Sequence, residues 1–337
     1  GGMGAVYEVR YLGDEPKIPN NESLALKVAL CDPKHKERLV NREFPILSKI
    51  YENPHANIIQ IYDLHIDPKT SQGYIVSEKL DYTLEKFITS NLALINDNNL
   101  CQKVIELFLP LVSAACHNKD LGIVHRDIKP ENIMWSEARK KLCFIDYGLA
   151  KKETDPTMTV TGSMVGSPGY MPPEQSYSKN ELTSKSDAYT LAIVCATMLN
   201  RGTLNCIKDF NPTQMLYQQS SSNGAVYLNE VALLGETNEE NEELRTILLG
   251  ALECDVDRRS DVDVFYKSLV DYYNLRMGGT VLIPKFKPEI KKVKTLEISG
   301  FFEAYDETTK EKSTRKSPRS SEKRNGTRSA ARNGYHA

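Results

Sequence analysis

Two short motifs near the middle of the chain constrain its fold and chemistry more than any other feature. Residues 125–132 read HRDIKPEN, and the motif DYG follows at residues 146–148. Together they supply two carboxylates, an amide and a cation, carried by Asp127, Asp146, Asn132 and Lys129. An unbroken set of these residue types at this spacing is not typical of the polar side chains of an ordinary surface loop.

These four side chains have the chemistry that phosphoryl transfer from ATP requires. The protein does little covalent chemistry in this reaction, so catalysis depends on positioning and on neutralising charge. Mg²⁺ prefers oxygen ligands and keeps several waters, which suits Asp146 and Asn132 as metal ligands. Asp127 is suited to orienting the attacking hydroxyl, and Lys129 to neutralising the transferring phosphate. We therefore expect a site that uses ATP and Mg²⁺.

The same motifs resemble the catalytic and metal-binding loops of eukaryotic-type protein kinases. The resemblance implies an α+β fold with two lobes. The N-lobe, at about residues 1–80, would be a small antiparallel β-sheet with one main helix, and the C-lobe, at about residues 81–275, would be larger and mostly α-helical. It also implies a protein substrate, with Asp127 and Lys129 as catalytic residues and Asn132 next to the nucleotide as well as the metal. A lysine two residues after Asp127 favours serine or threonine over tyrosine as the acceptor.

The start of the sequence resembles part of the family's glycine-rich loop, in which glycine lets backbone N–H groups approach the phosphates closely. Residues 1–7 read GGMGAVY. Gly1 and Gly4 would be the second and third glycines of G-x-G-x-x-G-x-V, and Val6 would cover the adenine. The first glycine and the strand before it are missing, so we expect the sequence to be a fragment of a longer chain. The same stretch resembles bacterial receptor-type kinases.

An apolar stretch at residues 22–30 (ESLALKVAL) predicts a half-buried strand. By the resemblance, Lys27 in this strand would contact the α- and β-phosphates of ATP. Glu43 lies in a helical pattern, NREFPILSKI, and would form an ion pair with Lys27. Pro45 is tolerated only in the first turn of a helix, so the sequence leaves the start of this helix open.

Residues 73–88 resemble the last strand of the N-lobe followed by the hinge to the C-lobe. Glu78 and Leu80 would lie in the hinge and bind the adenine through backbone groups. Ser77 would be the gatekeeper residue. Because serine is small, we expect an open back pocket that admits ATP analogues with bulky groups on the adenine amine.

Two apolar runs, at residues 100–118 and 191–199, predict buried helices of the C-lobe. We expect neither to span a membrane, because the first is interrupted by charged residues and a proline and both are too short. Asp187 precedes the second run. By the resemblance, its carboxylate would accept hydrogen bonds from the backbone of the catalytic loop.

The segment between DYG and GSPGYMPPE resembles an activation loop, because it is rich in Thr, Ser and Gly and lacks a hydrophobic period. We expect autophosphorylation there, with Arg126 in a position to capture the phosphate. Beyond the loop, Glu174 would form a buried ion pair with Arg259, since a buried carboxylate needs such a partner. The candidate phosphosites, among which the sequence does not decide, are Thr154, Thr157, Thr159, Thr161 and Ser163.

The composition agrees with a globular protein of this kind and indicates where it acts. The 337 residues carry a net charge of −2, and 40% of them are hydrophobic, which allows a sizeable core. The seven cysteines form no C-x-x-C pair, which indicates reduced thiols. We therefore expect a cytoplasmic location, or a host cytosol if the protein is a secreted bacterial effector.

Three regions carry no catalytic motif. Residues 200–243 are polar and irregular, and no role follows from them. Residues 276–309 are expected to form a C-terminal extension. Residues 310–337 hold nine Lys or Arg against two acidic residues, which predicts a disordered basic tail. Such a tail could contact acidic surfaces, nucleic acid or anionic lipid.

Three classes of function are compatible with these observations. The first is an active Ser/Thr protein kinase. The second is a pseudokinase or scaffold, which would explain the incomplete glycine loop but not the intact Lys27, Asp127 and Asp146. The third is a small-molecule kinase of the same fold, which would lack the MPPE segment and its distant arginine partner. The first class agrees best with the residues.

Overall fold

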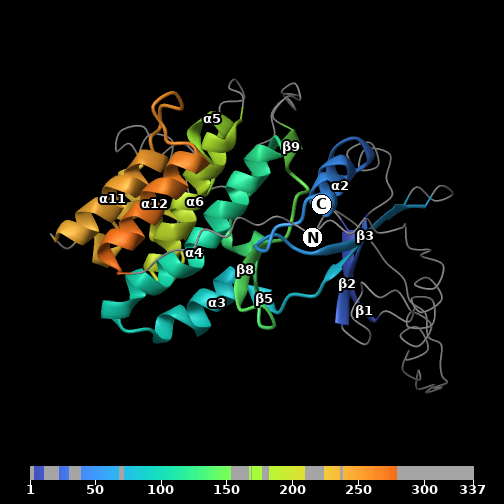
Figure 1. Ribbon diagram of the computed structural model, residues 1–337, viewed down its shortest axis with the longest axis horizontal. Helices are drawn as coiled ribbons and strands as arrows, with labels where there is room; N and C mark the ends of the chain where they lie inside the picture. The colour runs from blue at the N-terminus through green and yellow to red at the C-terminus, as the bar shows by residue number, and fades with distance from the viewer. Residues whose placement is uncertain are drawn as a thin grey trace, which may run out of the picture. The chain divides into compact units, whose positions relative to one another are not determined.

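The chain folds into a small β-sheet lobe followed by a larger, mostly helical lobe. The structure is a computed structural model. It describes residues 4–10, 23–29, 39–67, 72–152, 167, 169–176, 182–208, 224–235 and 238–278. These residues belong to one unit of the chain, which spans residues 1–296. In Figure 1 the blue strands and helix α2 gather on one side and the helices α4, α6, α11 and α12 on the other. Except for residues 276–278, the expected extension (276–309) lies outside the described residues, as does the whole basic tail.

The N-lobe contains a four-stranded antiparallel sheet in the order β1-β2-β4-β3. In β2 the apolar residues Leu24, Leu26 and Val28 alternate with more exposed residues, which is the period of a strand with one buried face. Val6 and Lys27 pair across β1 and β2 and therefore share one face of the sheet. The strands are β1 (Gly4–Arg10), β2 (Ser23–Ala29), β3 (Ile61–Ile66) and β4 (Gly73–Glu78).

One main helix, α2 (Phe44–Glu52), packs against this sheet, as the sequence predicts. Its buried residues include Phe44, Leu47 and Ile50, which recur at helical spacing. Pro45 stands in the first turn, where its missing N–H leaves no hydrogen bond unmade. A short π-helical turn, η1 (Leu39–Glu43), precedes it and carries Glu43 at its end.

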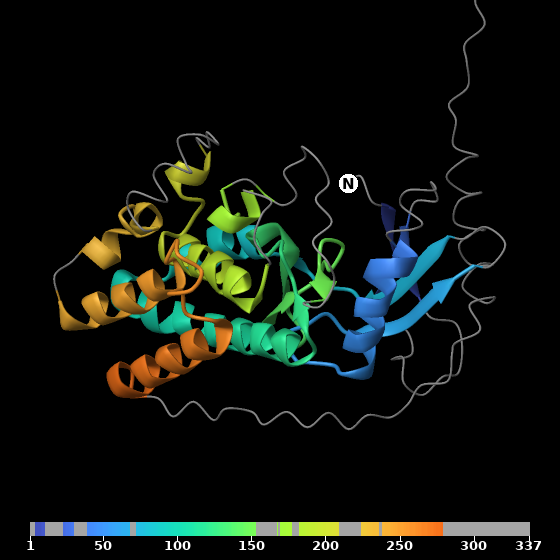
Figure 2. The same ribbon diagram turned by 90° about the horizontal axis from the view of Figure 1, so that it is seen from above.

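The C-lobe is built around two long helices, α4 (Asp97–Asp120) and α6 (Ser184–Leu199). Helix α6 is buried along almost its whole length, because α4, α11 (Glu239–Ala251) and α12 (Val262–Arg276) cover it. Figure 2 shows this bundle from above. The shorter helices of the lobe are α3 (Leu84–Ser90), η2 (Leu92–Leu94), α5 (Pro173–Ser176), α7 (Asn205–Lys208), α9 (Ala225–Leu228) and α10 (Ala232–Gly235).

Helix α4 is longer than the apolar run from which it was predicted. The apolar run at 100–118 looks too short to span a bilayer, yet the helix extends over 24 residues and passes the test of length and composition for a membrane span. Its surroundings explain its apolar character, since it packs against α6 and α12 and buries residues such as Phe108 and Val112 completely. Within the described part of the chain, α4 is thus, with α6, one of the two helices that form the core of the lobe.

Part of the region expected to be irregular is helical. Within residues 200–243 the described parts form α7, α9, α10 and the start of α11. The prediction missed these turns because the apolar residues are few and widely spaced. These few apolar residues nevertheless pack into the core, where Tyr227, Leu228 and Leu234 are buried.

Short strands between the lobes place the two sequence motifs side by side. β6 (Ile123–Val124) pairs with β9 (Lys151–Lys152), so the residues just before HRDIKPEN lie beside those just after DYG. Between them, η3 (Pro130–Asn132) leads into the hairpin β7 (Ile133–Ser136) and β8 (Lys141–Phe144), which β5 (Tyr82–Thr83) extends. The two motifs therefore meet although Tyr147 lies 20 residues after Asp127 in the sequence.

Candidate functional site

A cleft of about 430 Å³ lies where the sheet meets the hairpin and the DYG motif. Its walls are mostly apolar, and charged groups gather around Lys27 at the DYG end and around Glu78 at the end of β4, which is the usual make-up of a ligand site. The residues that line it come from both lobes: Val6, Tyr7, Glu8, Leu24, Ala25, Lys27, Glu43, Leu47, Ile59, Ile61, Ile75, Ser77, Glu78, Lys79, Leu80, Met134, Ile145, Asp146 and Tyr147.

The DYG end of the cleft contains the ion pair that the sequence predicts. Lys27 Nζ lies 2.9 Å from Glu43 Oε1 and 3.5 Å from Asp146 Oδ1. Burial favours the neutral lysine, but the charges of Glu43 and Asp146 outweigh it and raise the pKa of Lys27. The lysine therefore keeps its charge inside the cleft, next to the space where an anion would bind.

Asp146 keeps its negative charge for a related reason. Burial alone would raise its pKa, but the Lys27 charge and a hydrogen bond from the Gly148 N–H, 3.0 Å from Oδ1, bring the pKa below its ordinary value. The carboxylate side chain is 38% exposed. It is thus ionised and accessible, as a metal ligand must be.

Three neighbours, two from the loop at residues 125–132 and one from beyond it, hold Asp127. Asn132 Nδ2 donates to the Asp127 backbone oxygen at 2.9 Å and to Oδ2 at 2.8 Å. Lys129 Nζ lies 3.3 Å from Oδ2, and the Ser167 hydroxyl donates to Oδ1 at 2.9 Å. Ser167 also accepts a hydrogen bond from Lys129. The carboxylate is fixed in direction, with a cation beside it.

Asp187 at the start of α6 fixes the backbone of the same loop. Its two carboxylate oxygens accept hydrogen bonds from the N–H groups of His125, at 2.8 Å, and Arg126, at 3.0 Å. Arg126 has a left-handed φ of 70°, which is unfavourable for a residue with a Cβ. Burial raises the pKa of Asp187 to about 6, although both hydrogen bonds oppose the shift. The buried carboxylate thus stabilises a strained turn.

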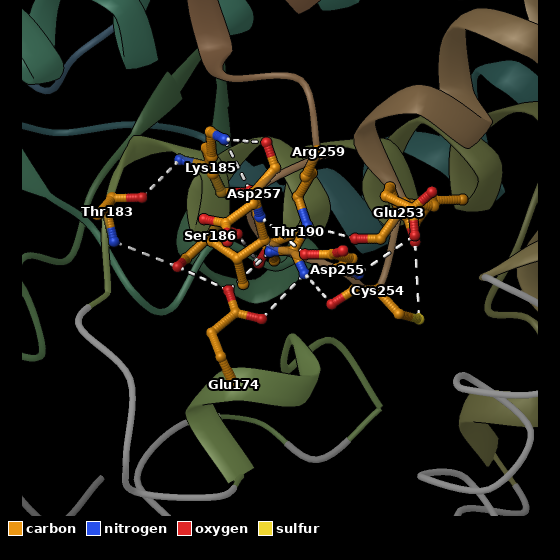
Figure 3. A network of polar contacts seen from close by, with 12 residues as sticks. Glu174, Thr183, Lys185, Ser186, Thr190, Glu253, Cys254, Asp255, Asp257 and Arg259 are labelled. Carbon is orange, nitrogen blue, oxygen red and sulfur yellow. Dashed lines mark hydrogen bonds and ion pairs between the residues drawn. The ribbon is translucent and has the colours of Figure 1, made fainter.

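The predicted pair of Glu174 and Arg259 joins α5 to the loop that precedes α12 (Figure 3). Arg259 Nη1 and Nη2 lie 2.6 and 2.9 Å from the two oxygens of Glu174, a bidentate arrangement. The Ser186 hydroxyl donates to the same carboxylate at 2.9 Å, and the guanidinium lies 4.7 Å from the Tyr189 ring centre. The pair is enclosed and has no access to the cleft.

The donor set of the cleft fits a divalent cation that is shared with a phosphate. Within the described part of the chain, no group of three or more His, Cys, Asp or Glu side chains could hold a metal by itself. Asn132 commits its amide nitrogen to Asp127, so its oxygen is the atom suited to a cation. One carboxylate and one amide oxygen, completed by water and phosphate, is the coordination that Mg²⁺ favours.

The residues predicted to form the hinge lie at the end of β4 and just after it, three residues or more beyond Ile75, the partner of Lys27 in the pairing of β2 with β4. Glu78 ends β4, and Leu80 follows it with 6% of its surface exposed; both line the cleft. The Glu78 carboxylate is held away from solvent by the Gln60 N–H at 2.7 Å and by Arg139. Ser77, the residue predicted to be the gatekeeper, lies in the cleft wall, and the use of bulky ATP analogues stays a prediction.

The remaining predicted site residues belong to the glycine-rich segment and to the activation segment. Val6 lines the cleft and Gly4 begins β1, whereas Gly1 lies outside the described residues. The five candidate phosphosites between 154 and 163 also lie outside them. The sequence reasoning missed the contact of Ser167 with Asp127 and Lys129, although GSPGYMPPE marked the segment. It also missed Met134 and Ile145 in the cleft wall, because isolated apolar residues carry no motif.

Comparison with known proteins finds protein kinases, the family that the motifs resemble. The family model described as Protein kinase domain matches residues 1–268. The chain is 33% identical over 202 residues to the probable serine/threonine-protein kinase PknB of Lactococcus lactis, a match that covers 59% of this chain and 30% of that protein.

Two further bacterial proteins are similar to it. Serine/threonine-protein kinase PrkC of Bacillus subtilis is 32% identical over 200 residues, covering 59% of this chain and 28% of that protein. Serine/threonine-protein kinase Pkn1 of Myxococcus xanthus is 30% identical over 204 residues, covering 59% and 27%. The chain thus spans about 30% of the length of these curated relatives.

Proposed function

The chain belongs to the protein kinase family, and from this membership we propose that it is an active serine/threonine kinase that transfers the γ-phosphate of ATP to hydroxyl groups of proteins. One observation carries the proposal: Lys27 lies between Glu43 and Asp146 in a cleft of both lobes. The neighbouring loop supplies Asp127, already oriented. A site in which the charged groups are in place before the substrate binds has no reorganisation left to perform during the reaction.

The cleft would bind ATP with the adenine at the hinge and the phosphates at the DYG end. The apolar wall formed by Leu24, Ile75 and Met134 suits a flat aromatic base. Lys27, held by Glu43, would bind the α- and β-phosphates. Asp146 and the Asn132 oxygen would hold Mg²⁺, which when bound neutralises charge on the phosphate oxygens.

Asp127 would orient the acceptor hydroxyl for attack on the γ-phosphate. Its carboxylate is fixed by Asn132 and by the Ser167 hydroxyl, so an incoming hydroxyl meets an acceptor of defined direction. Lys129, 3.3 Å from the same carboxylate, would stabilise the charge that develops on the transferred phosphoryl group. Positioning and electrostatics thus supply the catalysis, as expected for phosphoryl transfer.

The geometry disfavours the scaffold alternative. A pseudokinase needs neither a formed ion pair at Lys27 nor an ionised Asp146, yet this chain has both. A small-molecule kinase is disfavoured by the enclosed pair of Glu174 and Arg259, which anchors the MPPE segment expected of protein kinases.

Phosphate transfer from radiolabelled ATP to a generic basic protein tests the proposal. Asp127→Ala should lower the rate at least about 100-fold, because it removes the group that orients the nucleophile. Asp271→Ala, an exposed aspartate on α12, is the matched control and should keep the wild-type rate. Nucleotide binding without any transfer to Ser or Thr by the wild type would favour the scaffold instead.

We further propose that the kinase phosphorylates its own activation segment. The support is the chemistry of that segment, which holds Thr154, Thr157, Thr159, Thr161 and Ser163. Mass spectrometry of the wild type after incubation with Mg²⁺ and ATP should find phosphate on at least one of these residues. The Asp127→Ala protein should carry none, and equal phosphate on both proteins would contradict autophosphorylation.

The site of action that we propose is the cytoplasm. The cysteines in the described part of the chain are all free thiols, which a reducing compartment maintains. ATP is also available there as substrate. A reporter of subcellular location fused to the full natural protein would test this, and a location outside the cytoplasm would contradict it.

A further inference from the structure

The middle residue of the DYG motif makes a hydrogen bond that a phenylalanine, the family's usual residue there, could not make. Tyr147 is buried, with 1% of its surface exposed, and Asn118 of α4 is completely buried. Asn118 Nδ2 lies 3.2 Å from the Tyr147 hydroxyl, which lies 3.3 Å from Asn118 Oδ1. The amide and the hydroxyl therefore each have a partner in a region closed to water.

The surroundings of this pair are aromatic and apolar. The Tyr147 ring lies 4.7 Å from the His125 ring, which lies 5.3 Å from that of Phe144. Burial raises the pKa of Tyr147, so its hydroxyl keeps its proton and remains a donor. A polar group that loses its partner in such a place keeps the full cost of desolvation.

The pair connects the core of the C-lobe to the proposed metal ligand. Tyr147 follows Asp146 directly, and its hydroxyl reaches Asn118, on the face of α4 that is buried in the core of the lobe. Because the Tyr147 ring is rigid, a hydrogen bond that holds its hydroxyl also restrains the backbone of Tyr147, next to Asp146. That peptide aligns Asp146 with Lys27 and with the Gly148 N–H.

We propose that Asn118 is a positioning residue for the metal-binding loop: by holding the Tyr147 hydroxyl, it keeps Asp146 in the orientation that receives Mg²⁺. This rests on the proposed role of Asp146 in the kinase. Packing alone would hold a phenylalanine at this position, whereas the hydrogen bond adds one preferred rotation of the ring and so one preferred direction for the neighbouring carboxylate.

The test is a double-mutant cycle read out by binding rather than turnover. Asn118→Leu leaves the Tyr147 hydroxyl buried without its partner, Tyr147→Phe leaves the Asn118 amide without its partner, and the double variant replaces both polar groups by apolar ones. For each protein, calorimetry gives the affinity for ATP with and without Mg²⁺, and thermal unfolding gives the midpoint. Asn241→Leu is the control, since Asn241 is also buried and its Nδ2 has no hydrogen-bond partner among the described residues.

We expect Asn118→Leu to reduce the tightening of ATP binding by Mg²⁺ about fivefold to tenfold, the range that corresponds to one buried hydrogen bond. ATP binding without Mg²⁺ should change less than about twofold by the same scale. The double variant should recover most of the loss, and Asn241→Leu should show none. If Asn118→Leu proves too unstable to measure, Tyr147→Phe, which removes a single oxygen atom, should show the same loss.

Three results would overturn the proposal. A lower unfolding midpoint with an unchanged effect of Mg²⁺ would make Asn118 a purely structural residue. A double variant as impaired as the worse single variant would show that the two residues act independently. A wild-type protein whose ATP binding does not respond to Mg²⁺ would overturn this inference. If that protein still transfers phosphate to Ser or Thr, the proposed function stands; if it does not, both fail.

Discussion

Two carboxylate–cation pairs in this protein have similar geometry and opposite settings. Arg259 and Glu174 approach within 2.6 Å, and their side chains are 0% and 1% exposed. Lys27 and Glu43 approach within 2.9 Å, with side chains 24% and 8% exposed. The first pair is closed on all sides, whereas the second opens onto the cleft.

The two pairs differ in how many of their hydrogen-bonding and charged groups remain free to bind a ligand. Arg259 also donates to the backbone oxygen of Glu253 at 2.6 Å, and Ser186 donates to Glu174, so both partners are satisfied by the protein. Lys27 has a second anion, Asp146, only at 3.5 Å and lines a space large enough for a ligand. A pair that is fully satisfied stabilises the fold, and a pair that keeps donors accessible can bind a substrate.

The largest expected effect follows from breaking the closed pair. Glu174→Ala should lower the free energy of unfolding by about 3–5 kcal/mol, because it leaves the Arg259 charge buried without its partner. Chemical denaturation, followed by circular dichroism, measures this loss.

Two further variants separate the charge from the packing. Replacing both partners, Glu174→Leu with Arg259→Met, should cost less than the single change, because no charge is left uncompensated. Glu240→Ala, an exposed glutamate on α11, should have little effect. Equal stability of Glu174→Ala and Glu240→Ala would contradict the comparison.

Breaking the open pair should affect catalysis more than folding. Lys27→Met should lower kcat about 100-fold or more, since it removes the cation proposed to bind the phosphates. Steady-state kinetics measures this loss, and thermal unfolding of the same protein should show a smaller change than for Glu174→Ala. Wild-type turnover by Lys27→Met would contradict the assignment of the site.

A third prediction concerns His125, a buried group whose two ring nitrogens have no hydrogen-bond partner among the described residues. Burial lowers its pKa to about 4, although Asp127 and Asp146 oppose the shift. A base whose pKa is lower in the folded state stabilises the protein fully above its unfolded pKa, near 6.5, and loses that contribution as the pH falls. The protein should therefore become less stable between pH 7 and pH 5, and His125 should account for about 2 kcal/mol of the loss.

Denaturant unfolding at both pH values, with His125→Phe as the variant, measures this share. Phenylalanine keeps a ring beside Tyr147 and Phe144 but cannot take up a proton. The variant should thus lose less stability on acidification than the wild type. It should still lose some, because burial also lowers the pKa of His55 to about 4. Parallel losses in both proteins would show that His125 is not kept neutral by the fold.

The two regions also differ in how well the sequence predicts them. The family, the two-lobed α+β fold and the pairing partners Lys27 with Glu43 and Glu174 with Arg259 could all be predicted, because the motifs have fixed spacing and each buried charge needs a partner. The roles of these residues in catalysis remain predictions.

Other features could not be predicted, for identifiable physical reasons. The contact of Tyr147 with Asn118 joins residues 29 apart in sequence, and neither forms part of a polar pattern that indicates the other. The cleft wall at Met134 depends on strand pairing, which places apolar residues that look like any other core residue. The length of α4 was underestimated because its polar ends carry no apolar period, although they are helical.

The smallest expected effect tests whether the contribution of an ion pair to stability depends on the distance between its charges or on their burial. Lys140 and Glu137 approach within 2.5 Å, as close as Arg259 and Glu174, but their side chains are 71% and 46% exposed. Water and salt screen such a pair, and ordering two long side chains offsets most of its attraction. Lys140→Ala should leave the unfolding midpoint unchanged within experimental error. A loss comparable to that of Glu174→Ala would mean that separation, rather than enclosure, determines what these pairs contribute.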